Sequence, residues 1–416
     1  MSNIQQKQLD CGLCIITENI PGIKTAAFNW GVRAGVATNK HDGDSVLLAE
    51  LIQRGAAGLS AIEHNDALDS LGIRRQVSCG IEFFQVSAVM LGTHLTQGIP
   101  LLGAYLLNPT LPESDLEACK SLCLQSINSI DDNPSQQAGI ALNKHHIPSP
   151  FNRSAYGVTD VIKSATISRL QNVHQEHFVP NDSILVLAGD VDHNQVVDTV
   201  SELIGSWNGN KTDIPSTSTV DRGIHWIKQD TSQVHICFAI DGPNISDSNS
   251  ILEAVAVSVF GGATSGRLFT QVRQRRSLCY SVSAQFAASK ERSLIRMHAG
   301  TTPERANETI QVCLEQLSEL RNGISAEELA RTIQRLKSRT VMRGESTTAR
   351  ASALWGDQYA LGKTRSLQDR LEEIEGVTLE NVNNWLKNRD YGELTLVYIG
   401  PEDLNLDDDI LQLNTP

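Results

Sequence analysis

The chain has 416 residues, of which 40% are hydrophobic and 20% charged, and its formal net charge at pH 7 is −13. This length is too great for one ordinary hydrophobic core, so two domains of about 200 residues each are expected in a soluble globular protein. The acidic charge argues against a nucleic-acid-binding surface, and no apolar run approaches the ~20 residues that a helix needs to span a bilayer.

The N-terminal segment and the cysteines bear on the compartment. The segment MSNIQQKQLD has neither the charged start and apolar stretch of a signal peptide nor the arginines of a presequence, so a cytoplasmic location is expected. Cys11 and Cys14 have no second pair at zinc-ribbon spacing, and Cys119 and Cys123 share one helix face. The eight cysteines are therefore expected to be reduced thiols, mostly buried.

The predicted elements occur in the same order in both halves of the chain. The first half has a strand, two helices and a closing apolar strand at 83–90, 93–107, 113–130 and 184–188. The second half repeats them at 293–298, at 303–320, at a helix opened by the capping box Ser325 to Glu328, and at 394–399. A polar stretch with linker composition, NGNKTDIPSTSTVD, separates the halves. The sequence therefore predicts a duplicated α+β unit, with domains at 1–207 and 222–416 and a linker at 208–221.

One segment in the second half, FGGATSGRLFTQVRQRRSLCYSV at 260–282, has features of a binding site. Gly261 and Gly262 permit positive φ and close backbone approach, as a corner or a passing peptide needs. A helical stretch follows and is broken at Ser277, so Arg273 at a helix end and Tyr280 at a strand start can converge on one carbonyl or carboxylate. The alternative is that Arg273 belongs to a solvated helix face with the neighbouring arginines and that Tyr280 is a core residue.

This segment resembles the C-terminal half-domain of the M16 zinc metallopeptidases, the family of pitrilysin, insulinase and mitochondrial processing peptidase. Residues 265–269, SGRLF, resemble the Ser-Arg-Leu-Phe element of the family with Gly266 as a departure, and LCYSV resembles its Leu-Ala-Tyr-Ser-Val element. Further stretches, from LDCGLCIITENIPGIKTAAFNWGVRAGV to HFVPNDSILVLAGDVD, resemble the family in the same order over nearly the whole chain. The resemblance implies two homologous half-domains, each a largely antiparallel sheet packed with helices. It also implies that Arg273 and Tyr280, beside the glycines Gly261 and Gly262, bind the backbone of a substrate peptide.

The zinc motif of active family members is missing. In those members two histidines of His-x-x-Glu-His hold zinc, the glutamate activates water, and a later glutamate is the third ligand. In the register of the resemblance the motif falls on 46–50, where Val46, Ala49 and Glu50 replace the three functional residues. The third ligand would fall within 122–127, where Gln125 and Ser126 stand in place of acids. One carboxylate offers too few donors, so neither a zinc site nor a catalytic residue is predicted in this chain.

Other histidines offer alternatives to that prediction. SAIEH ends at His64, but its Ser60 and Glu63 form a capping box that explains them without metal. The run HQEH at 174–177 precedes a turn and favours a structural role. His145 and His146 are adjacent, so on a regular element their side chains would point apart.

The resemblance implies a role for a chain that retains the arginine and tyrosine without the zinc motif. Smaller members of the family pair two chains of this size, and in some the partner of the zinc-bearing chain supplies the Arg and Tyr. We therefore expect a non-catalytic, substrate-binding subunit of a heterodimeric zinc peptidase, with zinc in a partner of similar size and an extended peptide as substrate. The alternative is an inactive scaffold, as the core subunits of respiratory complexes are, or a homodimer that sequesters peptides. Neither nucleic acid nor membrane is expected as a partner.

Overall fold

The computed structural model of the chain describes residues 3–211, 213–214, 216–217, 219–407 and 410. They fall into two compact units. Unit 1 comprises Met1–Ser129, Ser149–Thr217 and Met342–Ser366, and unit 2 comprises Ile130–Pro148, Ser218–Val341 and Leu367–Pro416. Each unit therefore contains one short segment from the other half of the sequence, which the expectation of two sequential domains did not include. Residues 212, 215 and 218 of the polar stretch 208–221 lie outside the described residues.

The described strands of unit 1 form a six-stranded sheet in the order β1-β2-β6-β3-β5-β4. β2 and β6 are parallel and the other neighbours are antiparallel. The strands are β1 (Asn3–Gln8), β2 (Cys14–Asn19), β3 (Thr25–Val32), β4 (Arg74–Cys79), β5 (Phe84–Leu91) and β6 (Ile184–Gly189). The described α-helices of this unit are α1 (Asp44–Leu51), α2 (Ala61–Ser70), α3 (Leu95–Leu107), α4 (Leu116–Asp131), α6 (Thr159–Lys163), α7 (Ile167–His177), α8 (His193–Ile204) and α12 (Thr347–Leu361).

Among its described residues, unit 2 repeats this topology without a counterpart of β1. Its described strands follow the order β7-β11-β8-β10-β9, and again one pair, β7 with β11, is parallel. The strands are β7 (Gly223–Lys228), β8 (Val234–Asp241), β9 (Cys279–Ala287), β10 (Leu294–Thr301) and β11 (Thr395–Gly400). The helices are α5 (Pro134–His146), α9 (Ser250–Gly261), the π-helical turn η4 (Phe269–Arg275), α10 (Ala306–Glu319), α11 (Ala326–Gly344), α13 (Leu367–Glu375) and α14 (Leu379–Asn388). The predicted α+β fold with two largely antiparallel sheets is confirmed.

Both faces of each sheet are covered, because successive residues of a strand point to opposite faces. In β3, Phe28 and Trp30 belong to the large core under the helices, whereas Ala27, which precedes Phe28, packs in a smaller core on the other face. In β8, Phe238 lies in the main core of unit 2, whereas Cys237 and Ala239 face away from it. This two-sided burial explains why these strands read as continuous apolar runs in the sequence.

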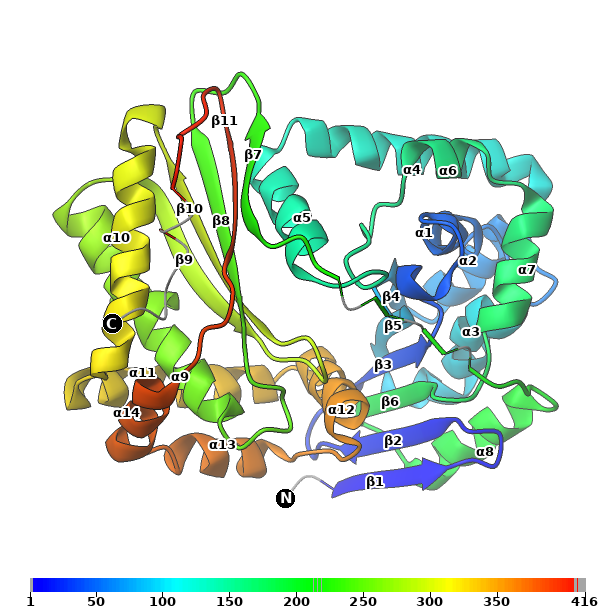
Figure 1. Ribbon diagram of the computed structural model, residues 1–416. Coiled ribbons are helices and arrows are strands. Elements are labelled where there is room, and N and C mark those ends of the chain that lie inside the picture. Colours follow the sequence, from blue (N-terminus) through cyan, green and yellow to red (C-terminus); the bar gives the residue numbers. More distant parts are fainter. Residues whose placement is uncertain (1–2, 212, 215, 218, 408–409, 411–416) are drawn as a thin grey trace. The chain divides into compact units, whose positions relative to one another are not determined.

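The second face of each sheet is covered by a helix from the other half of the sequence. α12 packs on the unit 1 sheet, where Trp355 donates a hydrogen bond to the Ile184 carbonyl at 3.1 Å. A Cβ atom at Gly31 would lie 2.6 Å from the Trp355 ring, so glycine is needed there. α5 packs in the same way on the unit 2 sheet through Ala138 and Leu142. Figure 1 shows α12, in orange, against the strands of unit 1.

Local sequence signals account for the helix boundaries. The capping boxes predicted at Ser60 and at Ser325 are confirmed, since each serine and the glutamate three residues later bond each other's backbone N–H. All eight cysteines are free thiols, as expected. Within the described part of the chain, no helix has both the length and the apolar composition that crossing a bilayer requires.

Candidate functional site

The degenerate motif positions lie on α1, as the sequence predicts. Leu47, Leu48 and Ala49 are buried in the core of unit 1, and Val46 packs against the same core. Glu50, at the last motif position, is half-buried on the same helix. This helix is therefore anchored by apolar contacts along most of its length, with one carboxylate available near its end.

Two thiols lie near the Glu50 carboxylate. Cys119 and Cys123 on α4 lie close enough for its charge to affect them. Burial raises the pKa of Cys123 to about 12, and the charge of Glu50 adds to the rise. Burial also raises the pKa of Cys119, although a hydrogen bond from Arg54 opposes this. In the absence of a metal ion, both thiols are therefore protonated at neutral pH. Val46 and Ala49 have no donor atoms, so the motif positions themselves offer zinc only the Glu50 carboxylate.

The histidines weighed as alternatives in unit 1 make structural contacts. The buried His64 ring lies 3.0 Å from the Leu101 carbonyl and packs edge-on against Tyr105. His174 lies 2.9 Å from the Leu106 carbonyl. Burial lowers the pKa of both rings, so they are neutral at pH 7. These contacts agree with the structural role that the sequence favoured.

The glycine segment of unit 2, residues 260–282 with the pair Gly261 and Gly262, joins α9 to η4 by close packing. A Cβ atom at Gly261 would lie 2.6 Å from the Ala284 backbone nitrogen, which places the end of α9 against β9. Gly262 is exposed and has φ −81°, so neither glycine uses the positive φ that the sequence allowed. Close approach is therefore the property that this pair provides.

Arg267 anchors the start of the helical stretch. Its guanidinium donates two hydrogen bonds of 2.8 Å to the Glu328 carboxylate and one of 2.9 Å to the Gly323 carbonyl. Glu328 in turn belongs to the capping box of α11. The sequence analysis identified both motifs but could not pair them, because 61 residues separate Arg267 from Glu328.

Arg273 and Tyr280 lie on the elements that the sequence predicts. Arg273 is exposed on η4, and its guanidinium lies 4.8 Å from the centroid of the Phe269 ring. Ser277 ends the turn with φ 53°, and Tyr280 follows at the start of β9. The Tyr280 side chain is 46% exposed, so it is not a core residue.

A β-bulge directs the Tyr280 side chain. Cys279 pairs with Thr301 and Ser281 pairs with Gly300, so Tyr280 is the extra residue on β9. A Cβ atom at Gly300 would lie 2.3 Å from the Tyr280 hydroxyl oxygen and 2.4 Å from Cζ, so the phenol ring crosses Gly300. The sequence analysis missed Gly300. A glycine inside a predicted strand is the signal that could have found it.

The arginines near Arg273 differ from it in having polar partners. Arg276 donates to the backbone carbonyl and side chain of Gln271, and Arg275 also approaches that side chain. Within the described part of the chain, neither the Arg273 guanidinium nor the Tyr280 hydroxyl makes a hydrogen bond or ion pair. Both groups are therefore free to donate to another molecule.

Comparison with known proteins tests the predicted resemblance. A family model described as the inactive domain of peptidase M16 matches residues 164–336, which include the glycine segment, Arg273 and Tyr280. A protein of Streptomyces coelicolor named as an uncharacterized zinc protease is 24% identical over 397 residues, covering 92% of this chain and 86% of the relative. The resemblance to the peptidase M16 family that the sequence predicts is thus confirmed for this segment.

Solved structures agree with the M16 fold. The peptidase M16 inactive domain from Pseudomonas fluorescens superposes with a TM-score of 0.88 at 18% identity, covering 97% of this chain and all of that one. A chain of Complex III from Candida albicans superposes with a TM-score of 0.81 at 17% identity, covering 98% of each chain. At these identities the likeness establishes the fold alone. The matched segment is thus described as an inactive M16 domain, whereas the relative from Streptomyces coelicolor is named a zinc protease.

Proposed function

We propose that this M16 chain is the non-catalytic, substrate-binding subunit of a heterodimeric zinc peptidase. The partner is an M16 chain of similar size that carries the zinc, and the complex is expected in the cytoplasm. The main support is that Arg273 and Tyr280 offer donors without a partner among the described residues. The motif positions on α1, in contrast, hold no ligand set for zinc.

The elements around these two residues suit an extended peptide. β9 is the last strand of its sheet, so its outer edge has backbone groups that can pair with an added strand. Tyr280 stands at the start of that strand, and Arg273 lies on the turn that leads into it. The guanidinium and the phenolic O–H would both donate to backbone carbonyl oxygens of the substrate. Stacking on Phe269 limits the motion of Arg273, which lowers the entropy lost on binding.

Reconstitution tests this proposal. The purified chain is assayed with zinc on an unstructured peptide, alone and mixed with an M16 chain that carries His-x-x-Glu-His and is encoded beside it. We expect cleavage by the mixture, and none by this chain or by a mixture whose partner has its catalytic glutamate replaced by glutamine. Cleavage by this chain alone would refute the assignment, because it would require a metal site on α1 or elsewhere in the chain.

A scaffold function is the second candidate, and the likeness to the Complex III chain favours it. A scaffold would need no free donors at Arg273 and Tyr280, whereas a peptide-binding subunit would. Purification from the native source separates the two. Recovery with a zinc-bearing chain of similar size supports the peptidase subunit, recovery in a large membrane complex supports the scaffold, and recovery of this chain alone supports a homodimer that sequesters peptides.

Replacing Gly300 with alanine should weaken peptide use by the reconstituted complex. The new methyl group would overlap the Tyr280 ring, so the hydroxyl would leave its position. Loss of one neutral hydrogen bond of about 0.5–1.5 kcal/mol corresponds to a roughly two- to tenfold fall in kcat/KM. The control is Gly139→Ala on α5, where nothing lies within 4 Å of the added Cβ. An unchanged kcat/KM for Gly300→Ala would show that the bulge does not position a binding group.

A further inference from the structure

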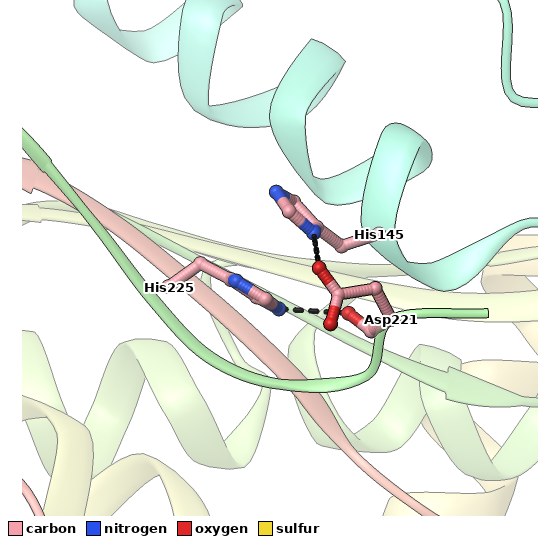
Figure 2. Close-up of side chains that lie close together, drawn as sticks. All are labelled: His145, Asp221 and His225. Carbon is pink, nitrogen blue, oxygen red and sulfur yellow. Dashed lines mark hydrogen bonds and ion pairs between the residues drawn. The ribbon is translucent and has the colours of Figure 1, made fainter.

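His145, Asp221 and His225 of unit 2 come together in the fold although they are distant in the sequence (Figure 2). His145 is in the last turn of α5, Asp221 precedes β7, and His225 lies on β7. Each offers one ligand atom, and these atoms all lie within 4.8 Å of one another. We propose that these three residues bind one divalent transition-metal ion of the zinc class.

Backbone and side-chain hydrogen bonds already hold the three residues in place. The Asp221 carboxylate lies 2.9 Å from Nδ1 of His145, and the Asp221 backbone N–H donates to the His145 carbonyl at 3.2 Å. Nε2 of His225 lies 2.8 Å from the Asp221 carbonyl. That carbonyl can only accept, so Nε2 carries the proton and Nδ1 of the neutral ring keeps its lone pair. A histidine that donates its second N–H to a backbone carbonyl is the arrangement usual for metal ligands.

The three side chains form a group that is open to solvent and includes a negative charge. The two imidazole rings are stacked, with centroids 3.5 Å apart and an interplanar angle of 18°. The Asp221 side chain is 78% exposed and supplies a negative charge, whereas that of His145 is 22% exposed. The group is therefore reachable from solvent and attracts a cation.

The donor types decide which cation fits. Two imidazole nitrogens and one carboxylate oxygen suit Zn²⁺, Co²⁺, Ni²⁺ and Cu²⁺, whereas Mg²⁺ and Ca²⁺ prefer oxygen donors throughout. Three protein ligands leave at least one position for water. Neighbouring residues do not compete, because the adjacent His146 is buried, with its Nδ1 2.8 Å from the Thr395 hydroxyl and its Nε2 3.3 Å from Asp241.

The prediction of no metal in this chain rested partly on His145 and His146 pointing apart. The two side chains do contact different partners, Asp221 for His145 and Asp241 for His146. The sequence could not show the contact of His145 with Asp221, because 76 residues separate them. This site is also separate in the chain from the motif positions 46–50. A bound ion would link the end of α5 to β7, the edge strand of the sheet that α5 covers. We therefore expect metal to stabilise unit 2 rather than to catalyse.

Cobalt titration of the untagged full-length chain, stripped with a chelator, tests the proposal. We expect one equivalent of Co²⁺ to give visible d–d absorption bands, and Zn²⁺ to abolish them. Zn²⁺ should also raise the midpoint of thermal unfolding, because it binds the folded state. The proposal would be refuted if the d–d bands were absent. It would also be refuted if far more than one equivalent of Co²⁺ bound without a rise in the midpoint of thermal unfolding.

Variants distinguish this site from adventitious binding by surface histidines. His145→Ala and His225→Ala should lose the bands, with folding checked by far-UV circular dichroism. Asp221→Asn keeps the shape of an exposed side chain and should weaken Co²⁺ binding at least about tenfold. His41→Ala, which removes an exposed histidine of unit 1, is the matched control and should bind as the unaltered chain does. Equal binding by His225→Ala and His41→Ala, or unchanged binding by Asp221→Asn, would refute the three-residue site.

Discussion

Replacing Arg273 with alanine is expected to lower the kcat/KM of the reconstituted complex by roughly tenfold to a hundredfold on an unstructured peptide. A charged hydrogen bond contributes about 1.5–3 kcal/mol, and the lost guanidinium would leave the substrate carbonyl without that donor. The chain itself should fold normally, because Arg273 is exposed and its contact within the described residues is the stacking on Phe269. The measurement is steady-state cleavage by the mixture, together with the urea midpoint of the isolated variant.

The neighbouring arginines provide matched controls for this result. Arg275 and Arg276 are exposed on the same turn and carry the same charge, but they approach Gln271. Their alanine variants should change kcat/KM by less than about threefold, because each loses only an exposed charge whose effect on the substrate is screened by salt. Arg273→Lys should be intermediate, because an ammonium group cannot form a bidentate pair. Equal losses for all three alanine variants would indicate general electrostatic attraction instead of a specific contact.

Removing Glu18 is expected to destabilise unit 1 by about 3–5 kcal/mol, the usual effect of leaving a buried charge without its partner. Glu18 on β2 and Arg350 on α12 have side chains that are 1% and 4% exposed. Two hydrogen bonds of 2.8 Å join the guanidinium to the carboxylate across 332 residues of sequence. Glu18→Ala would leave the Arg350 charge in the apolar layer between α12 and the sheet. Urea unfolding and hydrogen exchange in β2 and α12 would measure the loss.

Two further variants test the cause of that effect. Replacing both residues, as Glu18→Leu with Arg350→Met, should recover much of the lost stability, because apolar groups suit the site once neither charge remains. The exposed pair Arg331 and Glu327, whose side chains are 56% and 86% exposed, is the control. Glu327→Ala should change the free energy of unfolding by less than about 0.5 kcal/mol. A Glu18→Ala effect as small as this would mean that α12 is not held by the ion pair.

Much of the fold and part of the candidate site could be predicted from short-range patterns. Apolar periodicity predicted strands near β5 and β10 and the helices that follow them, and serine with glutamate three residues later predicted two helix starts. The placement of Arg273 on a helical turn and Tyr280 at a strand start also followed from local sequence. The bulge at Tyr280 did not, because it depends on register with Gly300 of the next strand.

The amino-acid sequence by itself determined the α+β class and the duplication, because each follows from periodicity within single segments. The placing of Val46 and Ala49 at zinc-motif positions is what the resemblance to the M16 family implies. Only the tertiary structure decided that α5 and α12 each cover a sheet built mainly by the other half of the chain. An amphipathic pattern shows that a helix has an apolar face but not which sheet covers it. The meeting of His145 with Asp221 and His225 follows from that exchange, since α5 carries His145 to β7.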